Sequence, residues 1–146
     1  MSSIHGTVVA IGGFGVLLRG APGSGKSSLA LRLIDSPGYG LGAVLLRTFL
    51  VADDQVEISK TPEGLLARAP AALAGLLEIR GLGIVKAPHQ AEVLLKLVID
   101  LEPAAAIARM PEAPESETQV MGITLKRLKL DVSDPAALAK IRAGLK

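Results

Sequence analysis

The stretch Gly20-Ala21-Pro22-Gly23-Ser24-Gly25-Lys26-Ser27 matches the pattern G-x-x-x-x-G-K-[ST] at every fixed position. The apolar run before it, residues 14–19, predicts a buried strand, and residues 27–34 after it predict the opening of a helix. A glycine loop between a strand and a helix gathers backbone N–H groups around one concavity, next to the positive end of the helix dipole. The stretch therefore predicts a phosphate-binding loop in an α/β domain.

The side chains of this loop have separate expected roles. Lys26 is expected to reach the terminal phosphates of a nucleoside triphosphate, and the Ser27 hydroxyl is expected to bind Mg²⁺. A chance glycine-rich loop is the alternative, which the complete match and the strand–loop–helix setting disfavour. The expected nucleotide-binding residues are Gly20, Ala21, Pro22, Gly23, Ser24, Gly25, Lys26, Ser27 and Ser28.

Composition narrows the class of protein. The 146 residues suit a single domain with a real core, and we assign residues 1–146 to one domain. Aromatic residues make up only 2% and the net charge is +2, which argues against a nucleic-acid surface. Cysteine is absent, so disulfides and thiolate metal sites are excluded. No run resembles a signal peptide or a membrane span, and a cytoplasmic enzyme or switch is expected.

Alternating apolar runs and turn signals predict the order of elements. Gly12-Gly13 offers a tight turn between two strands, so these are expected to form a hairpin. Residues 91–101 fit a buried strand or a helix, because periodicity does not separate the two. The proline-rich and glutamate-rich stretch 102–119 is expected to be an exposed linker. The expected strands are 5–11, 14–19, one within 44–52, 56–59, 64–68, 76–80 and 123–130, with helices from 27 to about 35 and from about 135 to 145.

The adjacent carboxylates Asp53-Asp54 end the apolar run of residues 44–52. At a strand end both side chains can lean over one crevice. One of them is expected to hold Mg²⁺, and the other to accept the proton of an incoming hydroxyl. A base of this kind suits transfer to a hydroxyl group better than hydrolysis. The alternative is a polar β-turn, in which aspartate is a common residue.

Other candidates carry weaker signals. Glu78 and Arg80 share a face if the strand alternates, and they could serve a metal and a phosphate. The alternative for this pair is an ion pair on a solvated face. His5 and His89 are lone histidines, a residue type that is more often structural or solvated than catalytic. The basic run 126–129 fits the solvent face of a strand.

Several segments together resemble one known family. They are Ile4-His5-Gly6, Gly13-Phe14-Gly15-Val16-Leu17-Leu18, the phosphate loop, Leu50-Val51-Ala52-Asp53-Asp54-Gln55-Val56-Glu57, and Leu77-Glu78-Ile79-Arg80-Gly81-Leu82-Gly83-Ile84. In this order they resemble the C-terminal catalytic domain of HPr kinase/phosphorylase. The last segment is the most specific, because Glu-Ile-Arg-Gly-Leu-Gly-Ile is similar to that family's own signature. The resemblance covers residues 4–85.

The resemblance implies a fold and an activity. The fold is an α/β P-loop domain with a mixed sheet, related to the nucleotide domain of phosphoenolpyruvate carboxykinase. The activity is phosphorylation, with ATP and Mg²⁺, of a seryl hydroxyl on HPr, the phosphocarrier of the phosphotransferase system. Many members also run the reverse reaction, in which inorganic phosphate attacks phosphoserine and pyrophosphate leaves. Members form homohexamers, so self-association is expected, together with an HPr-like partner and neither nucleic acid nor membrane.

The resemblance also implies roles for single residues. Asp53 would be the base in the kinase direction and the acid in the reverse direction, with Asp54 as its catalytic and metal-binding neighbour. Glu78 joins Ser27 and Asp54 at Mg²⁺. His5 would lie near the nucleotide phosphates. Arg80 is expected to bind phosphate on the separate ground of its residue type beside a glycine loop.

The chain also departs from the family pattern. It resembles short alphaproteobacterial forms that lack the usual N-terminal domain, and its link over residues 36–48 is longer than usual. The family's Pro-Val-basic-x-Gly-Arg-Asn segment, associated with the reverse reaction, is absent, and the nearest basic residues are Lys126 and Arg127. Two other functions stay open: a small-molecule P-loop kinase, and a nucleotide-dependent switch that needs no base at Asp53.

Overall fold

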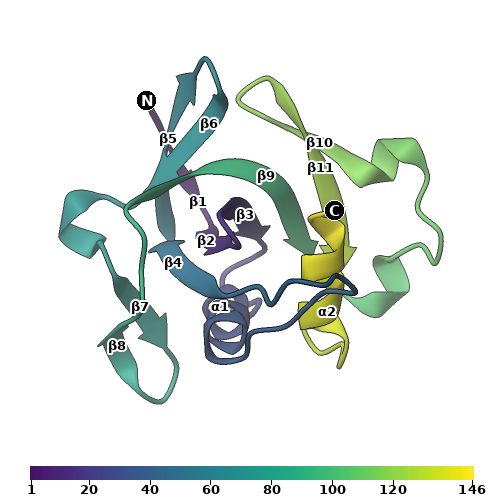
Figure 1. Cartoon of the computed structure of the whole chain (residues 1–146), viewed down its shortest axis with the longest axis horizontal. Helices are drawn as coiled ribbons and strands as arrows, with labels where there is room; N and C mark the ends of the chain where they lie inside the picture. The colour runs from purple at the N-terminus through teal and green to yellow at the C-terminus, as the bar shows by residue number, and fades with distance from the viewer.

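Strand β9 (Glu92–Leu101) lies at the centre of a curved, mixed sheet in the computed structural model, which describes residues 1–146 (Figure 1). On one edge β9 pairs in parallel with β3 (Phe14–Arg19). On its other edge it pairs first with antiparallel β6 (Gly64–Arg68), and then with parallel β11 (Ile123–Leu130). Residues 92–101 are therefore strand rather than helix, because neighbouring strands use both of their edges.

The chain before the phosphate loop forms the predicted hairpin. Strand β2 (Thr7–Ile11) pairs antiparallel with β3 around Gly12-Gly13, and its other edge pairs with β4 (Thr48–Ala52). The single strand predicted over residues 5–11 is wrong in one respect, because the chain divides at Gly6. The preceding strand β1 (Ser2–His5) pairs instead with β5 (Gln55–Thr61).

The remaining strands lie at the margins of the fold. Strands β7 (Leu76–Ile79) and β8 (Gly83–Lys86) form a separate two-stranded sheet. Strand β10 (Glu117–Val120) pairs with β11. The predicted linker 102–119 is mainly an exposed loop, but it contains two short 3₁₀ helices and its last residues belong to β10. The 3₁₀ helices of the chain are η1 (Ala71–Leu73), η2 (Ala104–Ala106) and η3 (Ala113–Ser116).

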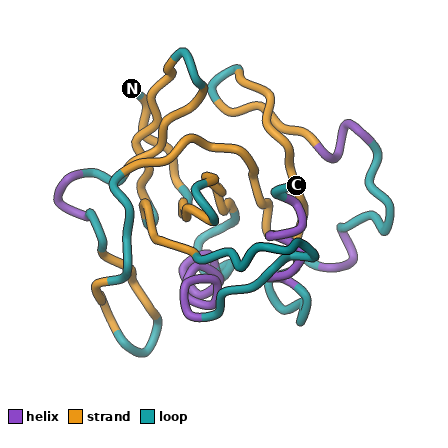
Figure 2. Tube along the Cα trace, viewed as in Figure 1, coloured by secondary structure: helices purple, strands orange, loops and turns teal.

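Two α-helices pack on the same side of the sheet. They are α1 (Lys26–Asp35) and α2 (Ala137–Gly144), whose apolar residues belong to one hydrophobic cluster; in Figure 2, α1 lies at the bottom centre and α2 to its right. Helix α2 begins two residues later than predicted, because the Asp134 carboxylate accepts the Ala136 N–H and forms a turn around Pro135. Neither helix has the length and hydrophobicity needed to cross a membrane.

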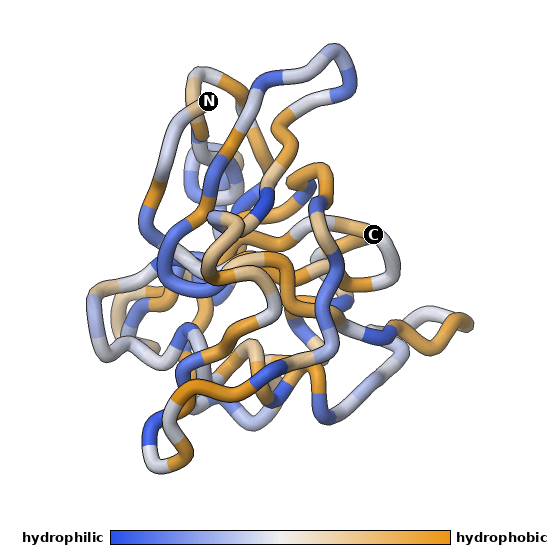
Figure 3. Tube along the Cα trace, turned by 90° about the vertical axis from the view of Figure 1, so that its left-hand side faces the viewer, coloured by the Kyte–Doolittle hydropathy of each residue, from blue (hydrophilic) through white to orange (hydrophobic).

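Two hydrophobic clusters occupy the two faces of the sheet. Val9 and Ile11 of β2 join the cluster that also contains the apolar residues of α1 and α2, while Val8 and Ala10 join the cluster on the opposite face. Strands buried on both faces are apolar without interruption, which is why β2 and the centre of β3 show no polar alternation. Figure 3 shows hydrophobic stretches through the middle of the molecule and also on some segments at its margin.

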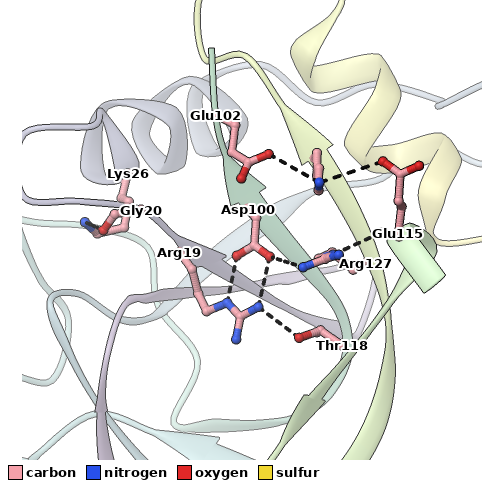
Figure 4. A network of polar contacts seen from close by, with 9 residues as sticks. Arg19, Gly20, Lys26, Asp100, Glu102, Glu115, Thr118 and Arg127 are labelled. Carbon is pink, nitrogen blue, oxygen red and sulfur yellow. Dashed lines mark hydrogen bonds and ion pairs between the residues drawn. The ribbon is translucent and has the colours of Figure 1, made fainter. Parts of the chain in front are cut away.

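An ion-pair network joins the carboxyl ends of the three parallel strands beside the phosphate loop (Figure 4). Arg19 of β3 donates to both carboxylate oxygens of Asp100 on β9, at 2.8 and 2.9 Å. Arg127 of β11 donates to the same carboxylate at 3.3 Å and to the Glu115 carbonyl at 3.0 Å. Lys129 lies between Glu102 and Glu115. The basic run 126–129 is therefore only partly a solvent face, because Arg127 and Lys129 are mostly covered.

The long link after α1 runs along α2 before it enters the sheet. The strand predicted within residues 44–52 is β4, which starts only at Thr48. Within the link, Gly38 and Leu46 form an isolated bridge. Arg142 of α2 is buried beneath this link and donates to the Ser36 carbonyl. Burial lowers the pKa of the Arg142 guanidinium from its ordinary value.

Candidate active site

The phosphate loop has the backbone that its sequence predicts. Gly25 adopts φ 98°, a conformation that glycine tolerates and most residues avoid, and it precedes the first residue of α1. Lys26 is buried, with only 8% of the residue exposed. Its ammonium donates to the carbonyls of Gly20 and Ala21, at 2.9 and 3.3 Å (Figure 4). A buried ammonium needs such acceptors. Reaching a phosphate therefore requires Lys26 to exchange these carbonyls for phosphate oxygens.

A cavity of about 570 Å³ opens beside this loop, a size that suits a small-molecule ligand. Most of the predicted site residues line it, and they come from segments far apart in the sequence. Gly20, Ala21 and Ser24 do not line it, and Thr7 and Ile79 line it although sequence reasoning missed them. The predicted residues that line the cavity are His5, Pro22, Gly23, Gly25, Lys26, Ser27, Ser28, Asp53, Asp54, Glu78 and Arg80.

The Asp53 carboxylate is held from three directions. Its Oδ1 atom accepts hydrogen bonds from the hydroxyls of Ser27, at 2.8 Å, and Thr7, at 3.0 Å. Its Oδ2 atom accepts the backbone N–H of Glu78 at 3.1 Å. These donors come from α1, β2 and β7, so Asp53 links three separate elements. A carboxylate bound in this way has little freedom to move toward a substrate.

The Asp54 carboxylate is held much less tightly. Asp54 has φ 69°, and the Gln55 N–H bonds to the Asp53 carbonyl at 2.8 Å, which makes Asp54 the centre of a left-handed γ-turn. Such turns are rare and strained, and strained residues cluster at functional sites. The Asp54 side chain is 67% exposed, and its one side-chain partner is His5 Nδ1 at 3.2 Å. His5 and Asp54 thus form a pair that faces the open cavity.

Glu78 and Arg80 meet at the cavity, although by a different route from the one predicted. Glu78 lies on β7, whereas Arg80 follows the end of that strand in the turn to β8, so strand alternation does not place it. Both side chains are exposed and both line the cavity. Strand β7 and the turn after it therefore bring a carboxylate and a cation to the cavity that the phosphate loop also lines.

Oxygen donors around the cavity fit a magnesium ion. Ser27, Asp53, Asp54 and Glu78 supply one hydroxyl and three carboxylates, the ligand type that Mg²⁺ prefers. No group of three or more His, Asp or Glu side chains forms a closed metal site by itself. Mg²⁺ at nucleotide sites commonly uses one or two protein ligands and completes its shell with phosphate and water. The donor set therefore matches a metal that arrives with a nucleotide.

The remaining candidates lie outside this cavity. The His89 ring nitrogen Nδ1 contacts the Ala87 carbonyl at 3.2 Å. The His89 backbone forms an isolated parallel bridge with Leu50 of β4. Lys126 donates to the Lys146 carbonyl at 3.4 Å, and Arg127 belongs to the Asp100 network. Neither basic residue lines the cavity.

Comparison with known proteins agrees with this geometry. The family model described as HPr Serine kinase C-terminal domain matches residues 1–143. The chain belongs to this family. The match to the HPr serine kinase C-terminal domain extends well beyond residue 85, where the resemblance in the sequence motifs ends. The expected P-loop fold with a mixed sheet is therefore confirmed.

Relatives named HPr kinase/phosphorylase share about a third of their aligned residues with the chain. The protein from Bordetella pertussis is 35% identical over 148 residues, covering 94% of this chain and 45% of its own length. The protein from Aromatoleum aromaticum is 37% identical over 143 residues, covering 90% of this chain and 42% of its own length. The chain thus spans less than half the length of these relatives.

A solved structure extends the comparison to the fold. The structure of the Hpr(Ser) kinase/phosphatase from Coxiella burnetii superposes with a TM-score of 0.78 at 22% sequence identity. The superposition covers 99% of this chain and 88% of that chain. The arrangement of strands and helices is therefore that of a known HPr kinase fold.

Proposed function

We propose that this chain is a kinase domain that transfers the γ-phosphoryl group of ATP to a seryl hydroxyl of an HPr-like phosphocarrier protein. One observation carries the proposal. The phosphate loop, the bound Asp53 carboxylate and the exposed Asp54–His5 pair all face a single cavity. The names of the relatives supply the substrate class, because each is an HPr kinase/phosphorylase.

The cavity residues support the following division of labour. The loop N–H groups and Lys26 hold the triphosphate, and Arg80 lies where it can neutralise phosphate charge. Ser27 and Asp53 would hold Mg²⁺, and Glu78 and Asp54 line the same cavity. When bound, the ion neutralises the charge of the β- and γ-phosphate oxygens.

We propose that the base is Asp54 rather than the expected Asp53. Asp53 already accepts three hydrogen bonds, whereas Asp54 projects into the cavity from a strained turn. The serine oxygen bonds to the γ-phosphorus while the bond from that phosphorus to the β,γ-bridging oxygen breaks. The serine proton passes to the Asp54 carboxylate, and ADP leaves. His5 orients this carboxylate through its 3.2 Å contact.

Transfer of label tests the proposal. The protein is incubated with γ-labelled ATP, Mg²⁺ and HPr from the same cell, and a serine-to-alanine HPr variant is the control. We expect label on the serine of HPr and none on the control. Label in a low-molecular-weight product would instead indicate a small-molecule kinase. ATP binding without transfer to any acceptor would indicate a nucleotide-dependent switch.

Variants of the two aspartates test the division of labour. Asp54→Asn is expected to lower the turnover number on the order of 10²–10⁴-fold at saturating Mg²⁺, the usual contribution of a general base. Asp53→Asn is expected to raise the Mg²⁺ concentration needed for half-maximal rate. Wild-type turnover in Asp54→Asn would remove Asp54 from the role of base. The reverse reaction is tested separately, with phospho-HPr, inorganic phosphate and detection of pyrophosphate.

The proposal extends to partners and location. We propose that residues 1–146 form one domain of a cytoplasmic protein that associates with copies of itself. Large apolar side chains on two projecting segments support contacts with proteins: Leu41 and Val44 are 88% and 69% exposed, and Leu82 and Ile84 are 70% and 69% exposed. Light scattering behind a sizing column measures the mass in solution, and a monomer at all concentrations would contradict self-association.

A further inference from the structure

Thr7 is a buried hydroxyl residue at the floor of the cavity. It is the first residue of β2, it is 0% exposed, and the four residues that follow it in the strand are apolar. Its Oγ1 atom donates to Asp53 Oδ1 at 3.0 Å. A buried hydroxyl without a partner is costly, so this bond explains how a polar side chain fits in an apolar strand.

The segment 5–7 lies directly opposite the two aspartates. The strand break at Gly6 faces the break between β4 and β5, because His5 pairs with Gln55 and Val8 pairs with Ala52. Three consecutive residues therefore hold the acidic pair. His5 contacts the Asp54 carboxylate, the Gly6 N–H bonds to the Asp54 carbonyl at 3.1 Å, and Thr7 bonds to Asp53.

The three donors to Asp53 differ in how firmly they are held. The Glu78 N–H belongs to the small separate sheet and is exposed. The Ser27 hydroxyl is itself an expected ligand of Mg²⁺. Its hydrogen bond to Asp53 positions Ser27 as much as it positions Asp53. Thr7 is the one donor that is completely buried and belongs to a strand paired on both edges. Thr7 therefore supplies the rigid end of this arrangement.

We infer that Thr7 is a positioning residue for the metal–nucleotide site, acting through Asp53. The inference rests on the proposed function. The Thr7 hydroxyl fixes the Asp53 carboxylate so that Oδ1 accepts a hydrogen bond from the Ser27 hydroxyl. The Ser27 oxygen would then keep its lone pairs free for a metal ion. Groups that orient metal ligands in this way typically change metal affinity or activity by 10–100-fold when they are removed.

Thr7→Val tests the inference, because it replaces the hydroxyl by a methyl group of similar volume in a strand that favours β-branched residues. Thr48→Val is a matched control. Thr48 is also a buried threonine, 4% exposed, on the strand next to β2, but its hydroxyl has no hydrogen-bond partner. Thr7→Ser keeps the hydroxyl and should rescue. Calorimetry measures binding of a non-hydrolysable ATP analogue over a range of Mg²⁺ concentrations, and the transfer assay measures turnover.

We expect Thr7→Val to raise the Mg²⁺ concentration needed for half-maximal analogue binding about 10–100-fold. Its turnover should fall, its affinity for the analogue without Mg²⁺ should not change, and Thr7→Ser and Thr48→Val should resemble the wild type. Equal behaviour of Thr7→Val and Thr48→Val would overturn the inference. If Thr7→Val does not fold, Thr7→Cys, whose thiol is a weak donor, is compared with Thr7→Ser, and equal Mg²⁺ dependence would again overturn it.

The two readouts separate this inference from the proposed function. Analogue binding needs no acceptor protein, whereas turnover does. A shifted Mg²⁺ dependence together with no transfer to HPr, even by the wild type, would leave Thr7 in its role and refute the proposed acceptor. Transfer by all variants with an unshifted Mg²⁺ dependence would refute the role of Thr7 alone.

Discussion

Neutralising the two neighbouring aspartates should affect stability very differently. Asp53→Asn weakens three hydrogen bonds, two to hydroxyls and one to a backbone N–H. Hydrogen bonds to charged groups contribute about 1.5–3 kcal/mol each and neutral ones about 0.5–1.5 kcal/mol. An asparagine oxygen that accepts the Glu78 N–H turns its NH₂ toward the two hydroxyls, which must then accept. The three contacts survive in weaker form, and the free energy of unfolding should fall by about 2 kcal/mol.

Asp54→Asn should leave stability almost unchanged. Asparagine tolerates the positive φ of this position about as well as aspartate does. The lost contact with His5 joins two exposed side chains, and such pairs contribute about 0–1 kcal/mol. Charge repulsion is the competing effect, because neutralising Asp53 relieves repulsion from Asp54 and Glu78. Asp54 and Glu78 are both exposed, so solvent already weakens their repulsion of Asp53. In Asp53→Asn the weakened hydrogen bonds therefore outweigh the relief of repulsion.

Thermal unfolding at neutral pH, without nucleotide or Mg²⁺, measures both variants. A change of 1 kcal/mol shifts the Tm of a domain of this size by about 2–4 °C, so Asp53→Asn should lower the Tm by about 4–8 °C. Asp54→Asn should stay within about 4 °C of the wild type. An unchanged Tm for Asp53→Asn, or an equal loss in both variants, would refute the interpretation that Asp53 is the structurally bound member of the pair.

Three further predictions concern other parts of the chain. Lys26→Ala should weaken ATP binding on the order of 10–100-fold, the effect of one charge-assisted hydrogen bond, and unchanged affinity in calorimetry would contradict a phosphate role. Gly15→Ala should destabilise by about 1–3 kcal/mol in denaturant unfolding, because its Cβ would lie 2.5 Å from the Leu94 carbonyl oxygen, and no loss would mean that β3 and β9 can separate. The hydrogen bond from Lys140 lowers the pKa of Asp134 from about 3.8, so its stabilisation is present above that pH and disappears as the pH falls through the folded value. Asp134→Asn should therefore lower the Tm at pH 6, and its Tm should fall less than that of the wild type when the pH drops below 4. A Tm that depends on pH as in the wild type would contradict this account.

Much of the site could be predicted because its chemistry is local in sequence. The phosphate loop needs a strand, a glycine loop and a helix in succession, and all three lie within residues 14–35. The Asp53-Asp54 pair stands out because two carboxylates interrupt an apolar run. Patterns of this kind report the residue type that a local conformation requires, so one sequence is enough to find them.

Other features depend on partners that are distant along the chain. Residues 91–101 have no periodicity that separates strand from helix. Residues 92–101 form a strand because three neighbouring strands hydrogen-bond to them. The break of the first strand at Gly6 follows from the two different strands that its halves pair with. Thr7 carried no sequence signal, because its role appears only when β2 lies beside the end of β4.

The sequence by itself determined that this chain has the pattern of a phosphate-binding loop and which residue types that loop contains, since a loop between a strand and a helix is a matter of neighbouring residues. Only the tertiary structure decided how differently the two aspartates are held. Adjacent residues of one type look alike in a sequence, but they point in different directions in the fold. One of them meets hydroxyls from β2 and α1, and the other is turned toward the open cavity.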